Sequence, residues 1–195
     1  MNFFRKVWEK VKPEPQKPDE ELSDLLLKLN NIHKINKVLY PASGFDANHI
    51  ISSFPFNIEM ITLDPGYTTK STNPLVKVNH GKLLVENAKF QDNLFDLIIS
   101  EMPYTWMQIT ETNEEYRAKI KNIIRMLKPN GFLVICGPSY SGYIGGHMNW
   151  PSVYSSANRI FHELPKIVSP NKRWCAFILT QKFKEKIMQE ELVAK

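Results

Sequence analysis

Small and polar residues follow the first predicted strand and suit the binding of a ligand. The apolar run 38–40 ends at Pro41, and the chain turns through Ala42, Ser43 and Gly44. Asp46 can cap a short helix that follows, and Tyr40 is the last residue of the run. Small side chains let a ligand approach the backbone, and the free N–H groups of a helix start can bind a carboxylate or a phosphate. The same residues also suit a turn without a ligand.

Two further sets of polar residues lie next to predicted strands, one just after a strand and one before the next. Asp64 comes directly after the apolar run 58–63, and a carboxylate there can accept hydrogen bonds from both hydroxyls of a ribose. The alternative is that Asp64 only opens an Asp-Pro-Gly turn. Glu86 and Asn87 precede the strand at 95–99 and could meet the exocyclic amine of an adenine, or could be isolated polar residues of a loop.

Polar and aromatic residues that could contact a substrate follow the next two predicted strands. Glu101 and Tyr104 lie just after the strand at 95–99 and Ser100. The loop 137–151 holds several glycines, aromatic residues that offer stacking area, and His147, which titrates near neutral pH. This many aromatic residues favours substrate contact over a plain surface loop. A role for His147 as a general base is a weaker hypothesis, because a positioned nucleophile needs little proton transfer.

The elements that must position these residues alternate along the chain. Apolar runs at 38–40, 58–63, 75–78, 95–99 and 132–136 predict strands, and periodic apolar faces predict helices near 114–127 and 153–163. This order predicts an α/β fold, a doubly wound and mostly parallel sheet. Residues 167–168 and 174–180 are too close for a helical crossover, so we expect an antiparallel hairpin at the C-terminal edge.

The chain divides into three parts. Residues 1–34 read as an N-terminal helical extension with a Pro-rich linker, 35–183 as the α/β domain, and 184–195 as a charged, solvated tail. A second helix begins near 18–21 and ends at Asn30 and Asn31. The pattern of residues 1–12 predicts a basic amphipathic helix, which could touch a membrane or a nucleic acid, or dock on its own domain or a second subunit.

Composition restricts the class of protein. The 195 residues carry a formal net charge of +5, which permits a polyanionic partner without requiring one. Cys136 and Cys175 are in predicted strands and outside any zinc-ligand or Cys-x-x-Cys spacing, so we expect reduced core thiols and no metal site. No apolar run approaches the length of a membrane span, and no signal peptide opens the chain. These features predict a cytoplasmic protein.

The order of these pieces resembles the class I S-adenosylmethionine-dependent methyltransferases over residues 35–182. Residues 38–44 resemble the family's first motif, Asp64 matches the acid that ends its second strand, and 124–135 resemble its turn into strand five. The family's sheet also ends in an antiparallel strand. The resemblance implies S-adenosylmethionine as the cofactor and an unidentified small-molecule or nucleic-acid acceptor. The cofactor-binding residues that it implies are Tyr40, Ala42, Ser43, Gly44, Asp46, Asp64, Glu86, Asn87 and Ser100.

The segment 100–104, Ser-Glu-Met-Pro-Tyr, is similar to the Asp/Asn-Pro-Pro-Tyr motif of amino-directed methyltransferases. The resemblance implies catalytic roles for Glu101 and Tyr104, and His147 is the third candidate. Several positions depart from the family pattern: Tyr40, Pro41 and Ala42 replace an acid and glycines, and Met102 replaces a proline. Asn130 replaces the first glycine of the later turn, a mild change because Asn tolerates the left-handed conformation.

Two other functions remain as alternatives. A non-catalytic methyltransferase-like module could bind a partner through its basic surface and N-terminal helix, which could also support a homo-oligomer. The departures in the first motif favour this alternative, whereas Asp64 and the aromatic loop favour the enzyme. A nicotinamide oxidoreductase is disfavoured, because the chain has neither the Gly-x-Gly-x-x-Gly spacing nor a Tyr-x-x-x-Lys motif.

Overall fold

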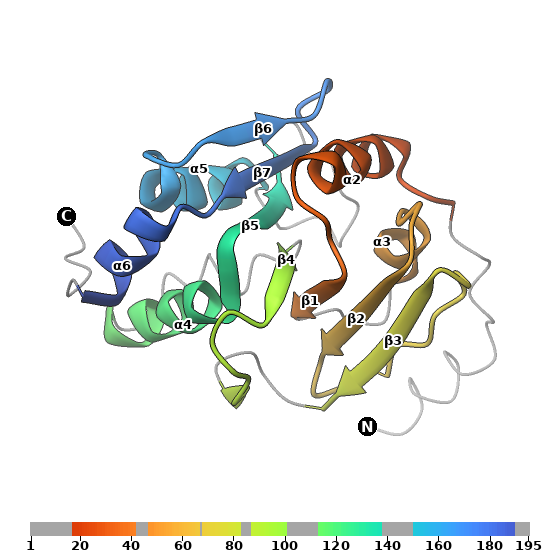
Figure 1. The fold of residues 1–195 in the computed structure, drawn as a ribbon, viewed down its shortest axis with the longest axis horizontal. Helices are drawn as coiled ribbons and strands as arrows, with labels where there is room; N and C mark the ends of the chain where they lie inside the picture. Colours follow the sequence, from red (N-terminus) through yellow and green to blue (C-terminus); the bar gives the residue numbers. More distant parts are fainter. Residues whose placement is uncertain are drawn as a thin grey trace.

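A seven-stranded sheet forms the centre of the molecule in the computed structural model. The structure describes residues 17–41, 47–66, 68–82, 87–100, 113–137 and 150–189. The strand order is β3-β2-β1-β4-β5-β7-β6, with β3 at one edge and β6 at the other (Figure 1). The strands are β1 (Lys37–Pro41), β2 (Ile58–Leu63), β3 (Val76–Gly81), β4 (Phe95–Ser100), β5 (Leu127–Cys136), β6 (Lys166–Val168) and β7 (Trp174–Ile178).

Strand direction confirms the predicted mostly parallel sheet. β1 runs parallel to β2 and β4, β2 runs parallel to β3, and β4 runs parallel to β5. β7 is antiparallel to β5 and forms an antiparallel pair with β6, so the predicted closing hairpin is confirmed. Five strands therefore end at one edge of the sheet, which we call the carboxyl edge.

Helices cover both faces of this sheet (Figure 1). They are α2 (Glu20–Ile32), α3 (Asn48–Ser52), α4 (Asn113–Met126), α5 (Trp150–Phe161) and α6 (Gln181–Gln189). Trp174 donates a hydrogen bond to Asp19 at the start of α2, while the ring of Phe177 contacts the ring of Phe161 in α5. Side chains three apart on a strand point to opposite faces, so α2 and α5 lie on opposite sides of β7. Among the described residues, no helix is both long and apolar enough to cross a membrane.

The predicted second helix is confirmed as α2. Asp19 caps it through Oδ1, which accepts a hydrogen bond from Leu22 N at 3.0 Å. Its buried stripe recurs at helical spacing and consists of Leu22, Leu25, Leu26 and Leu29. The last turn of α2 lies near the start of β1, at the amino edge of the sheet. The first turn of α2 therefore lies at the opposite, carboxyl edge.

The structure corrects two expectations about helices. The helix after β1 begins at Asn48 with Ala47 in the N-cap position and without a side-chain cap, so the predicted cap by Asp46 is wrong. Residues 184–189, which were expected to begin a solvated tail, belong instead to α6, and this helix buries Phe183, Lys184 and Ile187. Phe183 and Ile187 are four residues apart, which puts both on one helix face.

Lys184 ties α6 to the rest of the domain. Its side chain is almost fully buried, and Nζ donates to the carbonyl oxygens of Arg125 and Leu127 at 2.9 and 2.7 Å. Nζ also donates to Asn93 Oδ1 at 2.5 Å. Arg125 is in the last turn of α4, where carbonyl groups lack helical partners and the helix dipole favours a cation. Burial lowers the pKa of Lys184.

Candidate functional site

The carboxyl edge of the sheet brings the predicted cofactor residues together. Pro41 at the end of β1 pairs with Leu63 at the end of β2, and Asp64 follows directly. β4 lies on the other side of β1 and ends at Ser100, beside Ile135 of β5. In open α/β sheets, ligands bind outside the carboxyl ends of the strands.

Asp64 has two bonds that fix it at this edge. Its N–H donates to the carbonyl oxygen of Gly81 at 3.1 Å, which ties it to the end of β3. Its Oδ1 accepts from Gly66 N at 2.7 Å, an Asx-type turn. Asp64 is partly buried, and the hydrogen bond from Gly66 N–H holds its carboxylate in place. The turn expected as an alternative is thus present.

Tyr40 belongs to a row of paired residues near the carboxyl edge, in which Tyr40 and Thr62 are buried and His80 is partly buried. Tyr40 is 1 % exposed and pairs with Thr62, which in turn pairs with His80 of β3. Thr62 Oγ1 and His80 Nδ1 are 2.9 Å apart. The other ring nitrogen, His80 Nε2, is buried and has no hydrogen-bond partner among the residues that the structure describes. Paired residues of parallel strands share a face, so the side chains of this row lie on one side of the sheet.

The remaining predicted site residues divide into described and undescribed positions. Ser100 is 1 % exposed at the end of β4, whereas Asn87 is exposed in the connection to that strand. Outside the described residues lie Ala42, Ser43, Gly44, Asp46, Glu86, Glu101, Tyr104 and His147. Their roles stay predictions.

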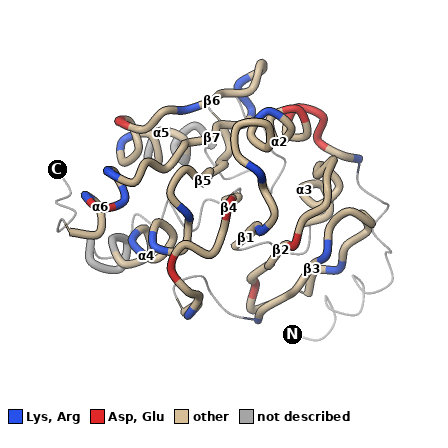
Figure 2. The backbone as a smooth tube through the Cα atoms, viewed as in Figure 1, with Lys and Arg blue, Asp and Glu red and all other residues tan. Residues whose placement is uncertain are grey.

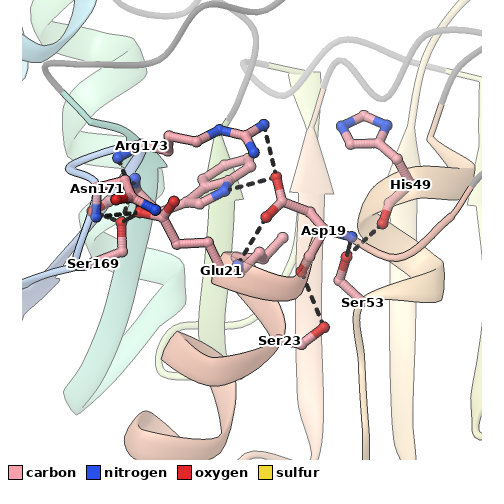
Figure 3. A network of polar contacts seen from close by, with 10 residues as sticks. Asp19, Glu21, Ser23, His49, Ser53, Ser169, Asn171 and Arg173 are labelled. Atoms are coloured by element: carbon pink, nitrogen blue, oxygen red, sulfur yellow. Dashed lines mark hydrogen bonds and ion pairs between the residues drawn. The ribbon is translucent and has the colours of Figure 1, made fainter.

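An open hollow of about 710 Å³ lies at the same edge, beside the first turn of α2. α2, α3 and the turn between β6 and β7 contribute its lining, and Figure 3 shows the start of α2 between the other two. Acidic residues gather at this start, while Lys and Arg are spread over several elements (Figure 2). Its lining includes Asp19, Glu21, His49, Asn171 and Arg173.

Asp19 joins α2 to both neighbours. Its Oδ2 accepts from Trp174 Nε1 at 3.1 Å and lies 3.0 Å from Arg173 Nη2. Its backbone N–H donates to Ser53 Oγ at 2.8 Å, and that hydroxyl donates to the carbonyl oxygen of His49 at 2.6 Å. One acidic residue thus holds the start of α2 against α3 on one side and β7 on the other (Figure 3).

Sequence reasoning missed the residues of this hollow. Asp19 and Glu21 read as acids that begin a helix, which is their common role. Arg173 has no local signal, because its partner is 154 positions earlier in the chain, a separation visible only after folding. Among the described residues, no group of three His, Cys, Asp or Glu could hold a metal. Burial raises the pKa of the Cys175 thiol to about 11, which disfavours a nucleophilic thiolate.

Comparison with known proteins adds a family match. Residues 56–135 match the family model described as methyltransferase domain. This span includes Asp64 and the strands from β2 to nearly the end of β5. A search among curated proteins found no match.

Several solved structures are similar to the chain. N-methyltransferase NodS from Bradyrhizobium japonicum is 15% identical over 83% of this chain and 96% of its own, with a TM-score of 0.49. A putative S-adenosyl-L-methionine-dependent methyltransferase from Methanococcus maripaludis is 15% identical over 89% of this chain and 88% of its own, with a TM-score of 0.44. The amino pentose methyltransferase CalS10 from Micromonospora echinaspora is 12% identical over 96% of this chain and 86% of its own, with a TM-score of 0.44.

The fold is assigned from the strand order and the antiparallel β7, together with the family match over β2, β3, β4 and most of β5. The chain has the fold of the class I S-adenosylmethionine-dependent methyltransferases and, over residues 56–135, matches the methyltransferase domain.

Proposed function

We propose that this protein is an S-adenosylmethionine-dependent methyltransferase. The observation that carries the proposal is Asp64, a carboxylate fixed at the carboxyl edge directly after β2 and beside the end of β1. The family match over this region supports the same activity. S-adenosylmethionine supplies an electrophilic methyl group on a sulfonium ion, so the protein's task is to bind and orient the two reactants.

The residues at the edge fit the ribose of this cofactor. Ribose hydroxyls are hydrogen-bond donors, and a carboxylate is an acceptor for both. Gly66 N–H holds Asp64 Oδ1 in the turn, so the side chain loses little further rotational freedom when a ligand binds. The predicted binding of the methionine end by residues 42–46 belongs to the proposal and lies outside the described residues.

The acceptor side of the proposal rests on the loops after β4 and β5. β4 and β5 are neighbours and end beside each other, since Ser100 pairs with Ile135. The residues that follow them include the candidates Glu101, Tyr104 and His147, which would therefore start from adjacent positions. The hollow beside α2 lies at the same edge and offers an open approach for a small acceptor.

Calorimetric titration of the full chain with S-adenosylmethionine and with S-adenosylhomocysteine tests the cofactor. We expect binding by the wild type, and a loss of about 1–3 kcal/mol in Asp64→Ala, the cost of unmade hydrogen bonds to a charged group. Asp64→Asn keeps an acceptor for Gly66 N–H, so it separates loss of charge from loss of the turn. Asp92→Ala is the matched control, an exposed acid outside the edge.

Two results would count against the proposal. An unchanged affinity in a folded Asp64→Ala variant would remove Asp64 from the cofactor site. An absence of binding by the wild type would favour a non-catalytic methyltransferase-like module. If binding is found, methyl transfer from radiolabelled cofactor to a panel of small amines, phenols and carboxylic acids would identify the acceptor class.

A further inference from the structure

The first turn of α2 binds the turn between β6 and β7 through a second carboxylate. Glu21 Oε1 accepts hydrogen bonds from the backbone N–H groups of Asn171 and Arg173, each at 3.2 Å. The same oxygen accepts from the hydroxyl of Ser169. Figure 3 shows Glu21 reaching across from α2 to these three residues. Hydrogen bonds to an ionised acceptor are stronger than those between neutral groups.

The β6–β7 turn needs a hydrogen-bond acceptor at the place that the Glu21 carboxylate occupies. Lys172 lies between the two donors and has φ of 61°, a conformation that costs energy for a residue other than glycine. Ser169 braces the turn from within, since its N–H donates to Trp174 O at 3.0 Å and its Oγ accepts from Trp174 N at 2.9 Å. The N–H groups of Asn171 and Arg173 have Glu21 as their acceptor. Glu21 therefore stabilises a strained backbone.

The β6–β7 turn also contacts Gly137, the first residue after β5. Gly137 N donates to Arg173 O at 2.5 Å. A Cβ on Gly137 would collide with the carbonyl oxygen of Lys172, so the backbone of the turn packs directly against Gly137. A shift of the turn would strain or break the hydrogen bond from Gly137 N. Gly137 follows Cys136, the last residue of β5, at the carboxyl edge.

We propose that Glu21 is a positioning residue for the acceptor side of the site. It acts through the β6–β7 turn on Gly137, and it sets the distance between the two walls of the hollow that α2 and the turn form. The inference rests on the proposed methyltransferase function, and it assigns no contact between Glu21 and either reactant. The proposed cofactor residue Asp64 directly follows β2, which is separated from the turn by β1 and β4.

Three variants of the full chain test this role. Glu21→Ala removes the acceptor, and Glu21→Gln keeps one neutral acceptor oxygen. Glu20→Gln is the matched control, because Glu20 is an exposed acid in the same helix turn and its change to glutamine removes the same charge near the helix start. Amide hydrogen exchange at Asn171, Arg173 and Gly137 is measured by NMR, and affinity for S-adenosylhomocysteine by calorimetry.

We expect exchange at all three amides to become at least tenfold faster in Glu21→Ala, to be partly restored in Glu21→Gln and to be unchanged in Glu20→Gln. Gly137 is the decisive amide, because it does not touch Glu21. Affinity for S-adenosylhomocysteine should stay within twofold. With an acceptor from the panel above, KM for the acceptor should rise at least fivefold in Glu21→Ala.

Unchanged exchange at Gly137 in Glu21→Ala, or no restoration by Gln, would overturn the proposal. An equal effect of Glu20→Gln would reduce Glu21 to a helix-dipole role and would also overturn it. If the wild type does not bind S-adenosylhomocysteine, the proposed function fails while the exchange results still decide whether Glu21 holds Gly137. An acceptor KM unchanged within twofold would refute the link between the turn and acceptor binding.

Discussion

Asp96 Oδ1 lies 2.7 Å from Lys128 Nζ at the amino edge of the sheet, opposite the candidate site. The side chain of Asp96 is 2 % exposed, whereas that of Lys128 is much more exposed. Asp96 Oδ2 accepts from the backbone N–H groups of Asn36 and Lys37, at 3.0 and 2.9 Å. One buried carboxylate thus joins β4, the start of β1 and the start of β5, and it serves stability at the edge away from the site.

Asp96→Ala should lower the free energy of unfolding by about 1–3 kcal/mol, because the backbone N–H groups of Asn36 and Lys37 and the ammonium of Lys128 lose a charged acceptor. The matched control is Asp92→Ala. Asp92 is exposed and pairs with Arg125 at 2.5 Å, so its loss should cost about 0–1 kcal/mol. Urea unfolding with the m-value monitored provides the measurement. Equal losses in the two variants would refute the structural role of Asp96.

The pH dependence of stability should report the same carboxylate. Burial raises the pKa of Asp96, but the hydrogen bond from Lys128 and two backbone N–H groups outweigh burial and hold the pKa below its usual 3.8. The unfolded chain therefore binds the proton more readily. The stabilisation is fully present above the unfolded pKa and is lost as pH falls through the folded pKa. The free-energy gap between wild type and Asp96→Asn should narrow as pH falls below about 4; a gap that widens would show the opposite shift.

Lys184→Met should lower the free energy of unfolding by roughly 1–3 kcal/mol, because two carbonyl groups near the end of α4 would lose their donor. Methionine keeps most of the apolar stem, so the change tests the ammonium. Lys182→Met is the control, since Lys182 is exposed on the same helix and should change stability by less than about 0.5 kcal/mol. Thermal unfolding by circular dichroism distinguishes the two. A loss confined to Lys182→Met would contradict the buried role of Lys184.

Asn130→Ala should destabilise the fold by about 1–2 kcal/mol, because Asn130 has φ of 63° and alanine resists the left-handed conformation. Asn130→Gly should change little, since glycine adopts this conformation freely but loses more entropy on folding. The next residue, Gly131, does not tolerate a side chain, because a Cβ would lie 2.8 Å from the carbonyl oxygen of Lys128. Chemical denaturation of both Asn130 variants tests the ranking, and equal stabilities would argue against a conformational cause.

Truncation of Tyr104 or Trp150 to alanine should reduce turnover and leave affinity for S-adenosylmethionine within twofold. We predict that these rings contact the acceptor alone, so their loss affects the transition state without weakening cofactor binding. Steady-state kinetics with an acceptor from the panel, combined with calorimetry, separates the two effects. A large loss of cofactor affinity in either variant would assign the ring to the cofactor side instead.

The sequence by itself determined the layout of the sheet and the kind of residue at its carboxyl edge. Largely apolar runs marked β1, β4 and β5, because strands buried on both faces carry no polar alternation. The short spacing before β7 indicated an antiparallel hairpin, and Asn130 was expected to tolerate the left-handed conformation that it adopts. These features depend on neighbours in the chain, which a sequence displays directly.

Only the tertiary structure decided which charged residues act as structural partners. Lys184 lies among charged residues that suggested a solvated tail, yet it is buried, because α6 packs Phe183 and Ile187 against the domain. Glu21 reads as a helix-start acid, and its partners Asn171 and Arg173 are about 150 positions away. A carboxylate has the same local sequence signature whether it faces water or a distant turn. Its partner is set by the packing of α2 on β7, and that packing exists only after the sheet has formed.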